Sequence, residues 1–245
     1  MQFFKKIEVL IDVVEAAEEE NIRQAVELIS QTIQEKRSVF IFGASHAGIL
    51  AQEMYYRAGG LALFNPIFAE ELMLNVEPIL HTSRMEQFPG YGTILAKRVP
   101  AKPGDVVIVH SVSGRNPVAL DLVMELQKLP VKVIAITNVA YSSATSSRHP
   151  SGKRLFELSD IVIDNHGPVG DAACTLEGLE QKVGATSTII GSILLHQIEV
   201  DVVAKLVEAG ISNVPVFYSA NLDGGFEKNQ NVIAGYAEQI HYRYQ

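Results

Sequence analysis

Cysteine is almost absent from the sequence, and tryptophan is entirely absent. Of its 245 residues, one is cysteine (Cys174) and none is tryptophan. A single thiol can form neither an internal disulfide nor a cysteine-based metal cluster. The seven histidines show no spacing typical of a zinc site. We therefore expect no bound metal and no other cofactor.

Basic residues and long hydrophobic runs are also scarce. The chain has 20 Lys and Arg against 28 Asp and Glu, a formal net charge of −8. No basic stripe can neutralise phosphates, so we do not expect nucleic acid as a partner. The apolar runs fall short of the roughly 20 residues that cross a membrane. The N-terminus lacks a signal peptide's apolar core and cleavage site. These absences predict a cytoplasmic protein without membrane contact.

The apolar residues that are present alternate between two patterns. Short apolar runs predict five strands, and helical spacing follows several of them. Strands that alternate with helices are typical of a parallel sheet covered by helices on both faces. The fold class is therefore predicted to be α/β, a three-layer α/β/α sandwich. The predicted strands are residues 38–43, 61–64, 105–111, 131–138 and 160–165.

We expect a single domain over residues 1–245, built in three parts. Residues 1–36 predict one long helix or two, with a possible break at Glu20-Asn21. Residues 37–210 form the α/β core, in which 65–104 is an irregular, proline- and glycine-rich insertion. The core ends in a long helix from about residue 184, apolar all round in its first half and therefore expected to be buried. Residues 211–245 form a tail with a last helix from about Glu227.

Two loops at predicted strand ends carry unusual residues. Residues 43–48 read GASHAG, and residues 110–117 read HSVSGRNP directly after the apolar run VVIV. Ligands of parallel α/β sheets bind at the carboxyl ends of the strands, near the point where strand order reverses. These loops are therefore the candidate ligand site.

Two enzyme-like interpretations of residues 43–48 compete. A dinucleotide fingerprint would need glycine where Ser45 stands and an acidic residue where Asn65 follows the second strand. A nucleophile elbow, G-x-S-x-G, would need glycine at Ala47 and several strands before it. Neither interpretation explains the residues of the second loop.

A third interpretation accounts for both loops. The N-terminus of a helix offers free N–H groups and a partial positive charge to an anion. Ser45 from the first loop, with Ser111, Ser113 and Asn116 from the second, would add polar groups that bind phosphate oxygens. Thr186, Ser187 and Thr188 open the long buried helix and could supply a third set. The plain alternative is that each hydroxyl only caps a helix.

Four stretches together resemble the SIS (sugar isomerase) domain family: VFIFGASHAG, GDVVIVHSVSGRNP, VKVIAITN and LFELSDIVIDN. The resemblance covers about residues 3–210. It implies a five-stranded parallel, flavodoxin-like sandwich that binds a phosphosugar through an S-x-S-G-x-[ST] loop. Ser111, Ser113 and Gly114 match that loop, whereas Asn116 replaces its last hydroxyl. Ser45 matches the first-loop serine of the family.

Isomerisation of a phosphosugar, or elimination from one, begins with removal of a proton beside a carbonyl, which needs a general base. Glu53 is the first candidate, because it shares a helix face with His46 about 10 Å along the axis. Phosphoheptose isomerases carry a glutamate at a similar place after Ser-His, and an exposed pair of Glu53 with Arg57 is the plain alternative. Glu71 is a second candidate. His196 is expected to be a core histidine, and His110 could line the pocket or satisfy the loop backbone.

We therefore predict binding of a phosphorylated sugar, with aldose–ketose isomerisation or a related lyase step. The alternative is a sensor that binds the sugar phosphate without turnover. The resemblance also implies a homodimer or higher homo-oligomer with shared sites.

Overall fold

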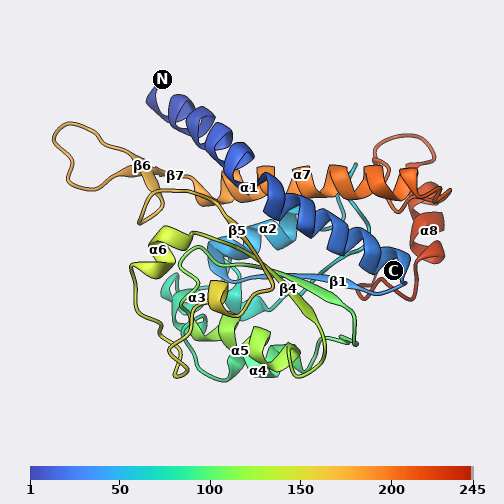
Figure 1. Ribbon diagram of the computed structural model, residues 1–245, viewed down its shortest axis with the longest axis horizontal. Coiled ribbons are helices and arrows are strands. Elements are labelled where there is room, and N and C mark those ends of the chain that lie inside the picture. The colour runs from blue at the N-terminus through green and yellow to red at the C-terminus, as the bar shows by residue number, and fades with distance from the viewer. Residues whose placement is uncertain (244–245) are drawn as a thin grey trace.

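Five parallel strands form the central sheet of the computed structural model, which describes residues 1–243 (Figure 1). Their order is β2-β1-β3-β4-β5, so the strand order reverses between β1 and β3. A crevice opens at such a point above the carboxyl ends of the strands. The predicted α/β class and five-stranded parallel sheet are confirmed. The strands are β1 (Val39–Gly43), β2 (Phe64–Pro66), β3 (Val106–His110), β4 (Lys132–Thr137) and β5 (Ile161–Asp164).

Helices cover both faces of this sheet (Figure 1). Side chains alternate along a strand, so Val39 and Ile41 pack against one helical layer while Phe40 and Phe42 pack against the other. Each fully buried side chain of this kind contributes about 1.5–3 kcal/mol. The first layer contains α1 (Gln2–Gln34), α2 (Gly48–Glu53) and α7 (Ser187–Glu208); the second contains α4 (Tyr91–Ala96) and α5 (Pro117–Leu126).

The N-terminal segment is one continuous helix, and the possible break at Glu20-Asn21 does not occur. Polar side chains around Glu20-Asn21 form hydrogen bonds and an ion pair with residues of the same helix. Asn21 Nδ2 donates to Glu18 Oε2 at 2.8 Å, and Arg23 pairs with Glu20 at 2.7 Å. Such contacts at spacings of three and four stabilise a helix where its apolar pattern is interrupted.

Residues 65–104 are more regular than their proline and glycine content predicts. They contain a 3₁₀ turn (Glu70–Leu72), α3 (Leu80–Met85) and α4, and α4 packs against α5. The carbonyl of Glu86, at the end of α3, accepts a hydrogen bond from Val118 N at 3.2 Å. This segment therefore covers the sheet and reaches the N-terminus of α5.

A two-stranded hairpin, which the sequence pattern did not predict, precedes α7. Its strands are β6 (Ala172–Cys174) and β7 (Val183–Ala185), and it projects beside the N-terminal end of α1 (Figure 1). The prediction that the first half of α7 is buried all round is wrong. Ile189 and Ile193 are 37% and 38% exposed, because α1, α2 and the sheet cover only the inner side of the helix.

The remaining short helices are α6 (Val139–Ser143), two 3₁₀ turns (Ser45–Ala47 and Leu155–Glu157) and α8 (Gly225–Gly235). After α8 the chain returns to the edge strand, where Asn65 Nδ2 donates to the Gln239 carbonyl at 2.9 Å. Within residues 1–243, no helix is both long and apolar enough to cross a membrane. Residues 244 and 245 of the predicted tail lie outside the described residues.

Candidate functional site

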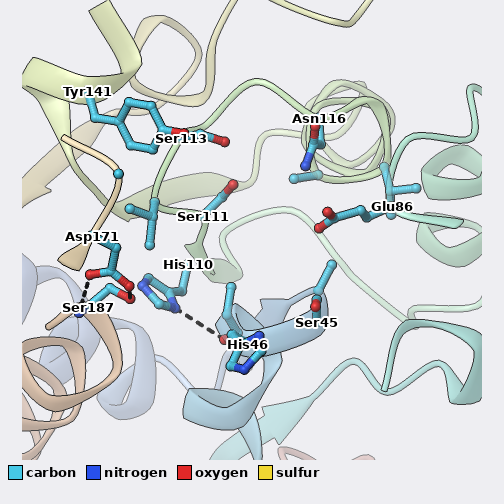
Figure 2. A pocket seen from close by; sticks show the side chains of 16 residues that line it. Ser45, His46, Glu86, His110, Ser111, Ser113, Asn116, Tyr141, Asp171 and Ser187 are labelled. Atoms are coloured by element: carbon cyan, nitrogen blue, oxygen red, sulfur yellow. Dashed lines mark hydrogen bonds between the residues drawn. The ribbon is translucent and has the colours of Figure 1, made fainter. Parts of the chain in front are cut away.

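A cavity of about 310 Å³ lies where the strand order reverses, at the ends of β1 and β3. Both serine-containing loops open into it, and they contribute five of the residues singled out from the sequence: Ser45, His46, Ser111, Ser113 and Asn116. Figure 2 shows these side chains around one space, together with groups from other segments. The further polar lining consists of Glu86, His110, Tyr141, Asp171 and Ser187.

The loop from 111 to 116 turns its carbonyl groups into the protein. Thr137 Oγ1 donates to the Ser111 carbonyl at 2.7 Å, and backbone N–H groups donate to the carbonyls of Val112, Gly114 and Arg115 at 2.8–3.0 Å. By contrast, the N–H groups of residues 113–116 have no acceptor among residues 1–243. These N–H groups precede α5, whose Pro117 at the first position needs no acceptor. Ser113 and Asn116 line the cavity, so unbonded donors of this loop are available there to an anion.

Gly114 makes this loop conformation possible. It has a φ of +56°, a region that side chains rarely adopt, and a Cβ there would lie 3.1 Å from Ser142 Oγ and 3.2 Å from Leu155 Cβ. Although Gly114 does not line the cavity, it shapes the donor array.

The first loop approaches the second through a partly buried hydrogen bond. Ala47 O lies 3.1 Å from Nδ1 of His110, the last residue of β3. Gly43 allows this approach, because a Cβ at that position would lie 2.2 Å from the same carbonyl oxygen. Ser45 holds a φ of +56° beside it, which places a hydroxyl-bearing residue at the cavity wall.

His110 is buried, with 1% of its surface exposed. Burial lowers the pKa of its imidazole to about 4, and the hydrogen bond to Ala47 and the charge of Asp171 only partly oppose this shift. The ring is therefore neutral at pH 7. Because Nδ1 faces a carbonyl, it carries the proton, and Nε2 keeps its lone pair. Nε2 has no partner among residues 1–243.

The N-terminus of α7 already holds an anion, the carboxylate of Asp171. Asp171 Oδ1 accepts from the N–H groups of Thr186 and Ser187 at 3.0 and 2.7 Å, and Thr186 Oγ1 donates to it as well. Burial acts to raise the pKa of Asp171, but these hydrogen bonds outweigh it and hold the pKa below its usual range. The donors predicted to form a third phosphate-binding set are thus occupied, and Thr188 does not line the cavity.

Glu86 supplies a second carboxylate to the cavity from a different direction. It follows α3 and faces the N-terminus of α5 (Figure 2). Burial raises the pKa of Glu86, and the side chain of Asn116 and the charge of Arg148 partly oppose the rise. Arg148 Nη1 donates to Asn116 Oδ1 at 2.9 Å. A carboxylate whose pKa is raised by burial is suited to accept a proton near neutral pH.

Glu53, the first candidate base, does not line this cavity. Its carboxylate pairs with Arg57, the plain alternative considered for it, and Oε1 also lies 3.1 Å from His196 Nε2. The other ring nitrogen of His196 lies 3.1 Å from the buried Glu199. Glu53 and His196 therefore form a carboxylate–imidazole cluster apart from the serine loops.

Glu71, the second candidate, also lies outside the lining of the cavity. Its Oε2 accepts a hydrogen bond from the hydroxyl of Tyr91 at 2.7 Å, and this bond lowers the pKa of Glu71. A lowered pKa makes a carboxylate a weaker base at neutral pH.

The nucleophile-elbow interpretation receives no geometric support. Among residues 1–243, no hydrogen bond joins the Ser45 hydroxyl to a histidine, a contact that activation of the serine would require. The same residues contain no group of three or more His, Cys, Asp and Glu side chains arranged to hold a metal ion.

Sequence reasoning did not select Glu86, Asp171 or Tyr141. Each enters the cavity from a segment without strong periodicity: the end of α3, the turn before β6 and the short α6. Their positions depend on tertiary contacts, such as the bond between Val118 N and the Glu86 carbonyl. No sequence signal marks Glu86, because its partial burial arises only in the folded structure.

Comparison with known proteins agrees with this fold. The SIS domain matches residues 2–138. A UPF0309 protein of Shouchella clausii is 52% identical over 241 residues, which cover 98% of each chain.

Two solved structures share the fold at low sequence identity. The phosphoheptose isomerase of Neisseria gonorrhoeae has a TM-score of 0.53 at 16% identity, covering 81% of this chain and 94% of its own. A protein of Escherichia coli CFT073, solved in complex with a phosphosugar, has a TM-score of 0.51 at 15% identity, covering 86% and 89%. Sequence and fold together place the chain in the SIS domain family, among its UPF0309 proteins.

Proposed function

We propose that the cavity binds a phosphorylated sugar, with the phosphate held by the loop from 111 to 116. The observation that carries this proposal is the set of N–H groups at residues 113–116 that lack an acceptor among residues 1–243 and lie at the N-terminus of α5 beside Ser111 and Ser113. A phosphate at a helix N-terminus gains from both hydrogen bonds and the helix dipole. Ser45 would donate from the facing loop.

The relatives support the same class of ligand. The structural neighbour from Escherichia coli CFT073 was solved with a bound phosphosugar, and the neighbour from Neisseria gonorrhoeae is a phosphoheptose isomerase. A phosphate loop built from serines and backbone N–H groups needs no lysine, in keeping with the residues of this loop.

We further propose that the protein catalyses an aldose–ketose isomerisation or a related proton abstraction, with Glu86 as the base. Glu86 lines the same cavity as the proposed phosphate loop, and burial raises its pKa. In an isomerisation it would take the proton from the carbon beside the carbonyl, giving an enediolate. It would return that proton to the neighbouring carbon. His46 lines the cavity as well and could help to move protons between the sugar oxygens.

Glu53, the first candidate from the sequence, is the alternative base. It contacts His196, so a carboxylate and an imidazole are available together for proton transfer. The cluster lies outside the lining of the serine-loop cavity, so this assignment requires the sugar to extend from the phosphate loop to α2.

Proton exchange measured by NMR tests the proposal. The wild-type protein is incubated in deuterated water with phosphorylated pentoses and hexoses, and exchange is followed at the carbon beside the carbonyl. We expect exchange with wild type and with E53Q, and none with E86Q. Loss in E53Q but not E86Q would assign the base to Glu53. Binding without exchange by any variant would make the protein a sensor of sugar phosphates, and the absence of binding would reject the proposal.

A further inference from the structure

One end of the cavity is built from hydrogen-bond acceptors. Figure 2 shows His110, Asp171 and Ser187 gathered at one side, away from Asn116. His110 and Asp171 come from different segments, the end of β3 and the turn before β6, yet both line the cavity. Figure 2 shows the two side chains next to each other.

His110 can act there only as an acceptor. Nδ1 faces the Ala47 carbonyl at 3.1 Å, an arrangement that requires the proton on Nδ1. Nε2 then presents a lone pair, and it is a buried polar atom without a partner among residues 1–243. A buried acceptor without a donor is costly, so a ligand that supplies the donor gains affinity.

Asp171 has acceptor capacity left over. Its Oδ1 receives three donors at the start of α7, whereas Oδ2 receives a single donor from the described part of the chain, the Ser187 hydroxyl at 2.7 Å. Oδ2 has two lone pairs and one donor, so it can accept a further hydrogen bond. A ligand hydroxyl that approaches this end of the cavity therefore meets two acceptors, and a ligand carboxylate meets a negative charge.

We infer that His110 and Asp171 form an acceptor pair that selects phosphosugars with a hydroxyl donor at the end opposite the phosphate, and rejects those with a carboxylate there. The inference rests on the proposed function, because it takes the phosphate to lie at residues 113–116. His110 is on this account a specificity-determining residue. Its Nε2 accepts a hydrogen bond from the ligand hydroxyl, while its Nδ1 holds the ring against the first loop.

Substitution of His110 separates these two roles. In H110N the amide nitrogen takes the place of Nδ1 and can still donate to Ala47, but the acceptor at Nε2 is lost. In H110Q the amide oxygen can reach the Nε2 position and restore an acceptor. The pair of variants thus distinguishes ligand recognition from support of the loop.

Calorimetric titration with inorganic phosphate, D-fructose 6-phosphate, D-glucose 6-phosphate, D-ribose 5-phosphate and 6-phospho-D-gluconate tests the inference. We expect wild type to bind at least one of the three phosphosugars that lack a carboxylate at least tenfold more tightly than 6-phospho-D-gluconate. In H110N the affinity for that sugar falls about tenfold, the effect of one hydrogen bond, while inorganic phosphate binds as in wild type. H110Q recovers most of the loss.

Nitrogen NMR of His110, assigned by its absence in H110N, gives a second measurement. We expect an unprotonated Nε2. Its signal should move on addition of the phosphosugar that lacks a carboxylate, but not on addition of inorganic phosphate. Equal sugar affinity in H110N and wild type, or an equal loss of sugar and phosphate affinity in H110N, overturns the inference and leaves the proposed function standing. If wild type binds no phosphosugar, the proposed function fails and the inference fails with it.

Discussion

The carboxylate of Asp171 occupies the N-terminus of α7 by bonding twice to Ser187: its Oδ1 accepts from the backbone N–H, and its Oδ2 accepts from the hydroxyl, both at 2.7 Å. A residue of the chain thus fills a helix terminus that could otherwise receive a ligand anion. The corresponding N–H groups before α5 stay unbonded within residues 1–243. On the proposed function, this difference places the phosphate at α5 and not at α7.

Removal of the Asp171 charge should destabilise the protein. In D171N the amide cannot replace both oxygens, so one or more donors of Thr186 and Ser187 lose their acceptor. We expect the free energy of unfolding to fall by about 1–2 kcal/mol, as for loss of a helix cap. Denaturant unfolding measures it. D223N removes an exposed carboxylate and serves as the control; an equal change in both variants would contradict the capping role.

His110 should make stability depend on pH. The folded chain protonates this ring only near its lowered pKa of about 4, whereas the unfolded chain protonates it near 6.5. Between these values the unfolded state binds more protons, so stability is lost as the pH falls from about 6.5 to 4, by roughly 3 kcal/mol. Unfolding measured across this range should show a smaller loss in H110N than in wild type. Parallel curves would contradict a buried neutral His110.

Gly114 should be required for the shape of the phosphate loop. A side chain there has the strain of a φ of +56° and also meets Ser142 and Leu155. G114A should lower stability by about 1–2 kcal/mol or more and weaken binding of inorganic phosphate. Gly152 has a φ of +74° with nothing within 4 Å of its Cβ position, so G152A has the strain without the contacts. Phosphate affinity should not change in G152A, and a change as large as in G114A would contradict the account.

Ser111 and Ser113 should each contribute more to phosphate affinity than Ser45, which faces them from the first loop. S111A and S113A each remove a hydroxyl next to the free N–H groups, and we expect each to weaken inorganic phosphate about fivefold to tenfold. S45A removes a hydroxyl from the other loop and should weaken the binding of inorganic phosphate less. Titration calorimetry gives the three ratios. Unchanged affinity in both S111A and S113A would place the phosphate elsewhere.

The parts of this structure that were predicted correctly are those with local causes. Four strands follow from short apolar runs, and the class of sheet follows from their alternation with helices. The strand predicted at residues 61–64 meets β2 (Phe64–Pro66) only at Phe64. Ser45 and Ser111 were selected because they directly follow strands that end at the same edge of a parallel sheet, and both line the cavity.

The parts that were missed depend on contacts between distant segments. Glu86 reaches the cavity because α3 is fixed against the start of α5, and Asp171 because a hairpin turns back to α7. Glu53 lies on the predicted helix after the first loop, but α2 ends at this residue, where its carboxylate faces Arg57 and His196. Neither the length of α2 nor the direction of Glu53 follows from helical spacing alone.

The crystal structure of the protein with the phosphosugar that stabilises it most tests the central claim most directly. The account predicts the phosphate within hydrogen-bond distance of the N–H groups of residues 113–116 and of the Ser111 and Ser113 hydroxyls, with the far end of the sugar facing His110 and Asp171. A phosphate bound at α7, or anywhere outside this loop, would contradict it.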